Sequence, residues 1–176
     1  MSPEIIDNFL TPNAFKELQI LLLGEEFPWF YMDKIDYPDD EDKFQFTHSF
    51  LDTPAFYDGA EEEGAPYTAR IFNFISNPYR IKANLIPRTA EIKVGKFHTD
   101  VPVETLRKIH TTSILYINTN NGYTEFKNGP KIESVANRFV TFPTIMEHRG
   151  TSCTDKKIRV VINFNYRGSG YGDDCN

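Results

Sequence analysis

The segment Phe97-His98-Thr99-Asp100 places an imidazole and a carboxylate two residues apart. On an extended chain such residues point to the same side, so both could bind one small cation. A third ligand must come from elsewhere in the chain, which has three other histidines, His48, His110 and His148. We favour His148, about fifty residues after His98, because it lies at the end of a predicted strand that a facing sheet could bring back.

Two imidazoles and one carboxylate on one face of a metal leave three positions open, which is the facial triad of iron(II) oxygenases. Neutral imidazole and carboxylate suit iron(II), although zinc or nickel could occupy the same ligands. Cys153 and Cys175 form no CxxC pair that would favour a closed zinc site. The two-residue pattern also occurs by chance, and a buried histidine with a satisfied hydrogen bond is more common than a metal ligand. Other residues of the sequence must therefore show whether His98 and Asp100 bind a metal.

That context begins with the segment 158–166, whose apolar and polar residues alternate as in a strand. One face would carry Val160, Ile162, Phe164 and Tyr166, and the other Arg159, Val161, Asn163 and Asn165. The second face could be exposed to solvent. It could also line a barrel, where the Arg159 guanidinium would bind a carboxylate through two parallel hydrogen bonds. Asn163 and Asn165 are then candidates to line the pocket, as are Asn84 and Arg88.

Short strands would position these residues. The sequence predicts them at 80–85, 91–94, 112–118, 123–127, 131–134, 138–142, 145–148 and 158–166, with a turn at 120–122. About eight closely spaced strands with few helices between them indicate an antiparallel sandwich or barrel, and a jelly roll fits that number. The 176 residues suit one domain, with a helical and loop support at 1–77, a β core at 78–166 and a tail at 167–176.

The N-terminal part is predicted to contain a helix at 11–24. Thr11 can cap it, Pro12 suits its first position and Gly24 its end, while an apolar stripe would pack on a sheet. Residues 27–31 form an aromatic cluster with strand propensity. Acidic runs at 39–42 and 61–63 predict solvated loops, and a second helix could lie within 64–77.

The ordered set of His98-x-Asp100, His148 and Arg159 resembles the 2-oxoglutarate/Fe(II)-dependent dioxygenases, and the prolyl-4-hydroxylase-like branch most of all. The resemblance covers about residues 78–166. It implies a mainly β fold, a double-stranded β-helix of the jelly-roll or cupin-like type with one or two flanking N-terminal helices. Iron(II) would be held by the triad, and 2-oxoglutarate by Arg159.

Further motifs extend the resemblance. Tyr116, within 114–118, matches the family tyrosine that contacts the far carboxylate of 2-oxoglutarate, and Asn163 is a further candidate for binding it. Residues 122–126 resemble the family's Gly-Gly-x-Thr-x-Phe turn. Residues 137–142 resemble its Gly-x-Leu-x-x-Phe strand, with Asn137 in place of glycine.

The resemblance implies O₂-dependent hydroxylation of an unidentified prime substrate, giving succinate and CO₂, with ascorbate as a further candidate cofactor. A prolyl or other protein side chain, a small molecule and a nucleobase all remain open as substrates. The alternatives are a cupin-like metalloenzyme that does not use 2-oxoglutarate and a non-catalytic jelly-roll binding module. Cupins favour an HxH pattern, which Asp100 does not fit, and a binding module would be expected to have lost a ligand.

The net charge and the hydrophobic pattern argue against other classes of protein, without excluding a local basic patch that binds nucleic acid. The net charge of −6 gives the chain as a whole no attraction to nucleic acid or anionic lipid. No apolar run reaches the roughly 18 residues of a membrane span, and the first residues do not resemble a signal peptide. We therefore expect a cytoplasmic protein with no membrane partner, and the sequence leaves its oligomeric state open.

Overall fold

The computed structural model describes residues 2–35, 43–52, 72–101 and 110–168. Within them lie one helix and ten strands: β1 (Glu4–Ile6), α1 (Pro12–Leu23), β2 (Phe30–Met32), β3 (Gln45–Asp52), β4 (Pro78–Pro87), β5 (His110–Tyr116), β6 (Tyr123–Phe126), β7 (Lys131–Glu133), β8 (Phe139–Pro143), β9 (His148–Gly150) and β10 (Ile158–Arg167). The large sheet has the order β1-β8-β5-β10-β4-β3-β2, and the small sheet β7-β6-β9. All pairs are antiparallel.

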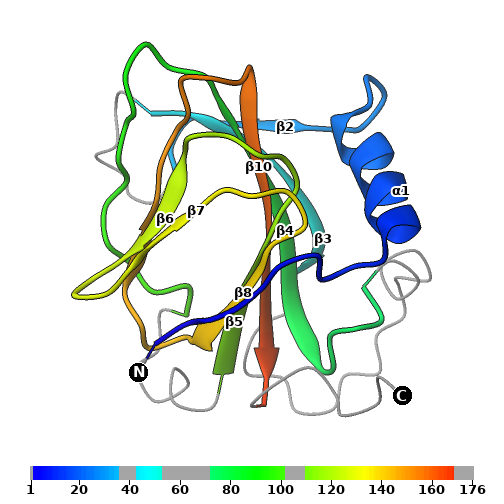
Figure 1. Cartoon of the computed structure of the whole chain (residues 1–176), viewed down its shortest axis with the longest axis vertical. Coiled ribbons are helices and arrows are strands. Elements are labelled where there is room, and N and C mark those ends of the chain that lie inside the picture. Colours follow the sequence, from blue (N-terminus) through cyan, green and yellow to red (C-terminus); the bar gives the residue numbers. More distant parts are fainter. Residues whose placement is uncertain (1, 36–42, 53–71, 102–109, 169–176) are drawn as a thin grey trace.

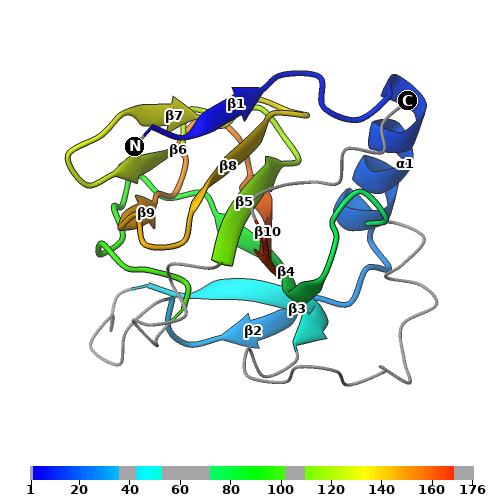
Figure 2. The same cartoon turned by 90° about the horizontal axis from the view of Figure 1, so that it is seen from below.

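The two sheets face each other, and α1 lies on the opposite side of the large sheet (Figures 1 and 2). One cluster of buried side chains joins α1 to the large sheet, and a second lies between the sheets. The predicted mainly β, jelly-roll fold is confirmed. Among the described residues, no helix has both the length and the apolar character needed to cross a bilayer.

Helix α1 is confirmed together with its ends. The Thr11 hydroxyl accepts a hydrogen bond from the Ala14 amide at 3.4 Å, Pro12 begins the helix, and Gly24 follows its last residue. The apolar stripe Phe15, Leu18 and Leu22 is buried against the large sheet.

Most of the predicted strands are present, but two predictions were wrong. The segment 91–94 makes only one isolated bridge, between Val94 and Thr151. Backbone hydrogen bonds flank this bridge, from the Ser152 amide to the Lys93 carbonyl and from the Gly95 amide to the Gly150 carbonyl. The Lys93 amide, however, donates to the Ser152 hydroxyl at 2.8 Å, and the pairing does not continue toward residue 91. The strand predicted at 145–148 instead begins at His148, after a turn in which the Met146 amide donates to the Pro143 carbonyl.

The N-terminal part contributes more to the sheet than its pattern indicated. Strands β1 and β3 pair with β8 and β4, and were not predicted. Residues 72–77 form turns and no helix. The rest of the possible second helix and both acidic runs lie outside the described residues.

Strand β10 links the core to the site. Its residues Val160, Ile162, Phe164 and Tyr166 are all buried on the side that faces α1, which we call the core face. Residues Arg159, Val161, Asn163 and Asn165 form the other side, the pocket face. In the register with β4, Arg159 lies opposite Ile86, and Asn163 opposite Lys82. The predicted alternation is therefore confirmed, and it directs Arg159 between the sheets.

Candidate metal and co-substrate site

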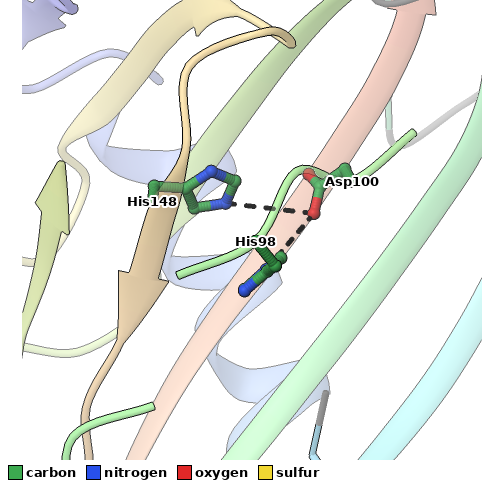
Figure 3. Close-up of side chains that lie close together, drawn as sticks. All are labelled: His98, Asp100 and His148. Carbon is green, nitrogen blue, oxygen red and sulfur yellow. Dashed lines mark ion pairs between the residues drawn. The ribbon is translucent and has the colours of Figure 1, made fainter. Parts of the chain in front are cut away.

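Three side chains from two segments meet between the sheets. His98 and Asp100 lie on the segment that follows β4, and His148 begins β9 (Figure 3). The Asp100 Oδ1 atom is 3.7 Å from His98 Nε2 and 3.9 Å from His148 Nε2. The possible ligand atoms of the three lie within 4.8 Å of one another, so they could bind one metal ion. This is the set of residues that the sequence predicted.

A short backbone bridge brings the two histidines together. The His98 amide donates to the His148 carbonyl at 2.9 Å, and the His148 amide donates to the His98 carbonyl at 3.0 Å. In such a hydrogen-bonded antiparallel pair the two residues lie directly opposite each other. The two-residue spacing then returns Asp100 to the same side as His98.

Each histidine ring is oriented by its own backbone. His98 Nδ1 lies 3.1 Å from the Lys96 carbonyl, and His148 Nδ1 lies 3.2 Å from the Met146 carbonyl. A carbonyl only accepts, so Nδ1 is the donor in both contacts, and Nε2 is the ring atom of each histidine that could bind a metal. The Nε2 atoms of both rings face Asp100, as a shared metal site requires.

Asp100 is held by a chain of hydrogen bonds that extends to β4. Its Oδ2 accepts from Asn165 Nδ2 at 2.9 Å, and Asn165 Oδ1 accepts from Arg80 Nη1 at 2.9 Å. The amide orientation is fixed, because a carboxylate only accepts and a guanidinium only donates. Burial by itself would raise the pKa of the Asp100 carboxyl. His148, Arg80, His98 and the Asn165 hydrogen bond together outweigh burial, so the pKa lies below its ordinary value and favours the ionised ligand.

Arg159 is a buried cation, only 2% exposed. Its Nε donates to the Ser134 hydroxyl at 2.9 Å, and its Nη2 donates to the Thr124 hydroxyl at 3.3 Å. No carboxylate among the described residues forms an ion pair with it, and burial lowers the pKa of its guanidinium. An isolated buried charge costs several kcal/mol, so this position suits a ligand that brings a carboxylate.

Glycines leave room around this guanidinium. A Cβ at Gly122 would lie 2.7 Å from Arg159 Cδ and 2.7 Å from the Ser152 carbonyl oxygen, so a side chain there would displace the arginine stem. A Cβ at Gly150 would lie 3.6 Å from Arg159 Nη1. Gly122 is thus needed for a close approach rather than for an unusual backbone angle.

Tyr116 lies behind the pocket. Its ring is fully buried, the Arg159 guanidinium lies 5.7 Å from the ring centroid, and its hydroxyl donates to Thr124 Oγ1 at 2.8 Å. Thr124 lines the cavity and Tyr116 does not. The predicted role of Tyr116 toward 2-oxoglutarate therefore stays a prediction, with Thr124 between this tyrosine and the cavity.

The triad and Arg159 line one cavity of about 200 Å³, which Asn84, Arg88 and Asn163 also line. The buried Oδ1 of Asn163 has no hydrogen-bond partner, and a ligand in the cavity could supply one. Asn165 acts instead through its bond to Asp100. Sequence reasoning missed Thr124, Ser134 and Arg80 as parts of the site. Thr124 lay within a quoted family motif, whereas nothing local in the sequence marks the other two.

The donor set fits iron(II) and 2-oxoglutarate. Two imidazoles and a carboxylate, without a thiolate, suit iron(II). Cys153, the free cysteine of the described residues, is buried, and its thiol donates to the Lys156 carbonyl. The cation of Arg159 and the hydroxyls beside it suit a carboxylate farther along the same cavity.

The sequence by itself matches no protein-family model, and no curated protein sequence matches it. Solved structures do resemble this fold. An oxidoreductase of the 2OG-Fe(II) oxygenase family from Burkholderia pseudomallei has a TM-score of 0.62 at 9% identity, over 97% of this chain and 87% of that one. A Trichoplax adhaerens prolyl hydroxylase, in complex with a hypoxia inducible factor peptide fragment, has a TM-score of 0.59 at 15% identity, over 94% and 83%.

HygX from Streptomyces hygroscopicus, solved with nickel and 2-oxoglutarate bound, also has a TM-score of 0.59, at 7% identity, over 96% of this chain and 83% of that one. These identities are low, so the likeness concerns the arrangement of the chain in space. This chain has the double-stranded β-helix fold of the 2-oxoglutarate/Fe(II) oxygenases, as its sequence resemblance implied.

Proposed function

We propose that this protein is a 2-oxoglutarate- and iron(II)-dependent oxygenase that hydroxylates an organic prime substrate. One observation carries the proposal: a metal-type triad lines the same cavity as a buried arginine that pairs with no carboxylate of the described residues. The fold likeness supports it, because HygX, which shares the fold, was solved with nickel and 2-oxoglutarate bound.

In this proposal His98, Asp100 and His148 hold the metal, and the Arg80–Asn165 pair keeps Asp100 oriented and ionised. Arg159 binds the far carboxylate of 2-oxoglutarate, with the Thr124 hydroxyl beside it. Iron(II) and 2-oxoglutarate together supply the oxidising chemistry, in which O₂ is consumed, succinate and CO₂ are released and one oxygen atom enters the substrate. The chain itself binds, orients and shields the reactants.

The two alternatives from the sequence account for fewer of the observations. A cupin-like metalloenzyme that does not use 2-oxoglutarate would need the triad, but it would have no use for a buried arginine whose printed partners are the hydroxyls of Ser134 and Thr124. A non-catalytic binding module would have no use for the bond from Asn165 that holds Asp100 in place. The role expected for ascorbate stays a prediction.

A single-turnover experiment tests the reaction. The protein is loaded with Fe(II) and 2-oxoglutarate under argon, exposed to O₂, and succinate is measured by mass spectrometry. We expect about one succinate per iron site, and none from Asp100→Ala. Lys16→Gln, on the exposed side of α1, serves as the control that keeps the yield. If succinate does not form although iron and 2-oxoglutarate are both bound, the oxygenase proposal is wrong and the cupin-like alternative leads.

A further inference from the structure

The backbone pairing that joins the two histidines of the triad is short. The described segment 94–100, which carries His98 and Asp100, forms no strand of either sheet. It pairs with the chain around β9 at two isolated bridges, Val94–Thr151 and His98–His148. A metal site needs its ligands held to within about 0.5 Å. A side-chain contact next to the second bridge would therefore help to fix the position of His98.

Such a contact lies on the side of the small sheet that faces away from the cavity. Thr124 on β6 and His148 on β9 line the cavity. Side chains alternate along a strand, so their neighbours Glu125 and Arg149 point to the opposite side, which we call the back face. The register of β6 and β9 places Glu125 directly opposite Arg149.

Glu125 holds the Arg149 side chain in place. Arg149 Nε donates to Glu125 Oε2 at 2.7 Å, and Arg149 Nη2 lies 2.6 Å from the same oxygen. On the other side of the carboxylate, Lys131 Nζ lies 3.6 Å from Glu125 Oε1. The hydrogen bond from Arg149 is the main cause that lowers the pKa of Glu125, so the carboxylate is ionised and binds the guanidinium.

The guanidinium held in this way covers the ring of Phe97. The Arg149 Cζ atom lies 4.1 Å from the ring centroid, within the range of a cation–π contact. Phe97 directly precedes His98, and Arg149 directly follows His148. The contact therefore joins the two chain segments of the bridge by a second connection, one residue away from each histidine.

From this geometry we infer that Arg149 is a positioning residue for the metal centre. Its guanidinium, held by Glu125, stacks on Phe97 and so fixes His98 relative to His148. Arg149 itself lines no part of the cavity. The inference rests on the metal-binding part of the proposed function and adds to it a residue on the back face, outside the cavity.

The test measures Fe(II) affinity by anaerobic titration. Arg149→Ala should weaken binding about tenfold, at the lower end of the range for groups that orient metal ligands. Arg138→Ala is the matched control, because it removes an arginine that is held by a carboxylate in the same way, with its Nε 2.7 Å from Asp7 Oδ1. It should lower the free energy of unfolding of the metal-free protein by a similar amount and leave Fe(II) affinity unchanged.

A double-mutant cycle shows whether Arg149 acts through Phe97. Phe97→Leu should weaken Fe(II) binding about as much as Arg149→Ala, whereas Phe97→Tyr keeps the ring and should keep the affinity. The double variant Arg149→Ala/Phe97→Leu should bind Fe(II) no worse than either single variant by more than about twofold, because both remove one contact. Independent effects would multiply to a loss of about 100-fold.

The outcomes separate this inference from the proposed function. If Arg149→Ala binds Fe(II) as tightly as the unsubstituted protein, if Arg138→Ala loses as much, or if the two losses multiply, the inference is wrong and the proposed function stands. If the unsubstituted protein binds Fe(II) but gives no charge-transfer band with 2-oxoglutarate, the proposed function fails and the cycle still tests Arg149. If it binds no Fe(II), both are wrong.

Discussion

The two faces of strand β10 are both buried, yet their environments differ. On the core face, Phe164 lies among the rings of Phe72, Phe74 and Phe139, with centroid distances of 5.3, 5.6 and 6.0 Å. On the pocket face, Arg159 has hydroxyl partners but no carboxylate partner within the described ranges of the chain, and Asn163 Oδ1 has no hydrogen-bond partner. Apolar packing and the hydrogen bond between Tyr166 and Ser113 satisfy the first face, whereas the second keeps polar groups that a bound ligand could satisfy. The difference indicates that one strand both stabilises the fold and carries the site.

The largest effect is expected from a substitution on the core face. Phe164→Ala removes a fully buried ring and leaves a cavity, and we expect the free energy of unfolding to fall by about 3–5 kcal/mol. Urea denaturation measures it. The fraction that remains folded should still bind Fe(II) with unchanged affinity, and a selective loss of iron binding without loss of stability would contradict the separation of the two faces.

Removing a metal ligand should abolish metal binding and leave the stability of the core almost unchanged. Asp100→Ala should lower Fe(II) affinity by more than about 100-fold, which exceeds the effect of losing a group that only supports a ligand. The thermal midpoint of the metal-free protein should change little in comparison with Phe164→Ala. Anaerobic titration with Fe(II) gives the affinity, with Asp33→Ala, an exposed aspartate, as the matched control. Equal iron affinity in both variants would rule out the triad.

Arg159→Met should affect the stability of the fold and the affinity for 2-oxoglutarate differently, and so tests the comparison between the two faces. The substitution removes the charge but keeps a long apolar stem, so the free energy of unfolding should stay within about 1 kcal/mol or increase. Affinity for 2-oxoglutarate should fall about 30-fold or more, since a charge-assisted hydrogen-bonded pair is lost. Calorimetry with Mn(II) in place of iron measures the affinity. A variant that is strongly destabilised but binds 2-oxoglutarate normally would mean that Arg159 belongs to the core.

A smaller effect is expected for the group that supports Asp100. Asn165→Leu removes the hydrogen bond to Asp100 and should weaken Fe(II) binding about tenfold, within the range for such supporting groups. Binding of 2-oxoglutarate to the metal-loaded protein should change much less, because Arg159 is untouched. Titrations of one preparation with iron and with 2-oxoglutarate measure the two affinities. Equal losses of affinity for both would indicate a general disturbance of the strand.

The smallest effect is expected for an ion pair that belongs to neither face of β10, between Asp7 and Arg138. Asp7 accepts from Arg138 Nε at 2.7 Å and Nη2 at 3.0 Å at a half-exposed position. The Arg138 hydrogen bond lowers the pKa of Asp7. Its stabilisation is therefore present above the ordinary aspartate pKa of about 3.9 and is lost as the pH falls through the lower folded pKa. Asp7→Asn should cost less than about 1 kcal/mol at pH 7, and the cost should be smaller at pH 2. Urea curves at both pH values test this.

The sequence predicted the core of the fold and the site because both depend on local patterns. Alternation in 158–166 separated the two faces of β10 correctly, and the spacing of His98 and Asp100 placed both on one side of an extended chain. Partners distant in sequence were not predictable. The Arg80–Asn165 contact depends on the register between β4 and β10, and the choice of β3 as the neighbour of β4 depends on the folded sheet.

The two wrong predictions have similar causes. Residues 91–94 alternate like a strand, but the Lys93 amide donates to the Ser152 side chain, and the pairing stops at one bridge. The strand that contains His148 begins later than its apolar pattern suggested, because the chain turns after Pro143. In both places a single hydrogen bond outweighs the local pattern, and His98 and His148 still meet through their own bridge.

The most direct test of the pocket face is the visible spectrum of the protein with Fe(II) and 2-oxoglutarate under argon. We predict a metal-to-ligand charge-transfer band that appears only when both are present. It should be absent in Asp100→Ala, and in Arg159→Met it should be recovered only at high 2-oxoglutarate concentration. If no band forms although iron is demonstrably bound, the metal and the co-substrate do not share this site, and the account given for the pocket face of β10 is wrong.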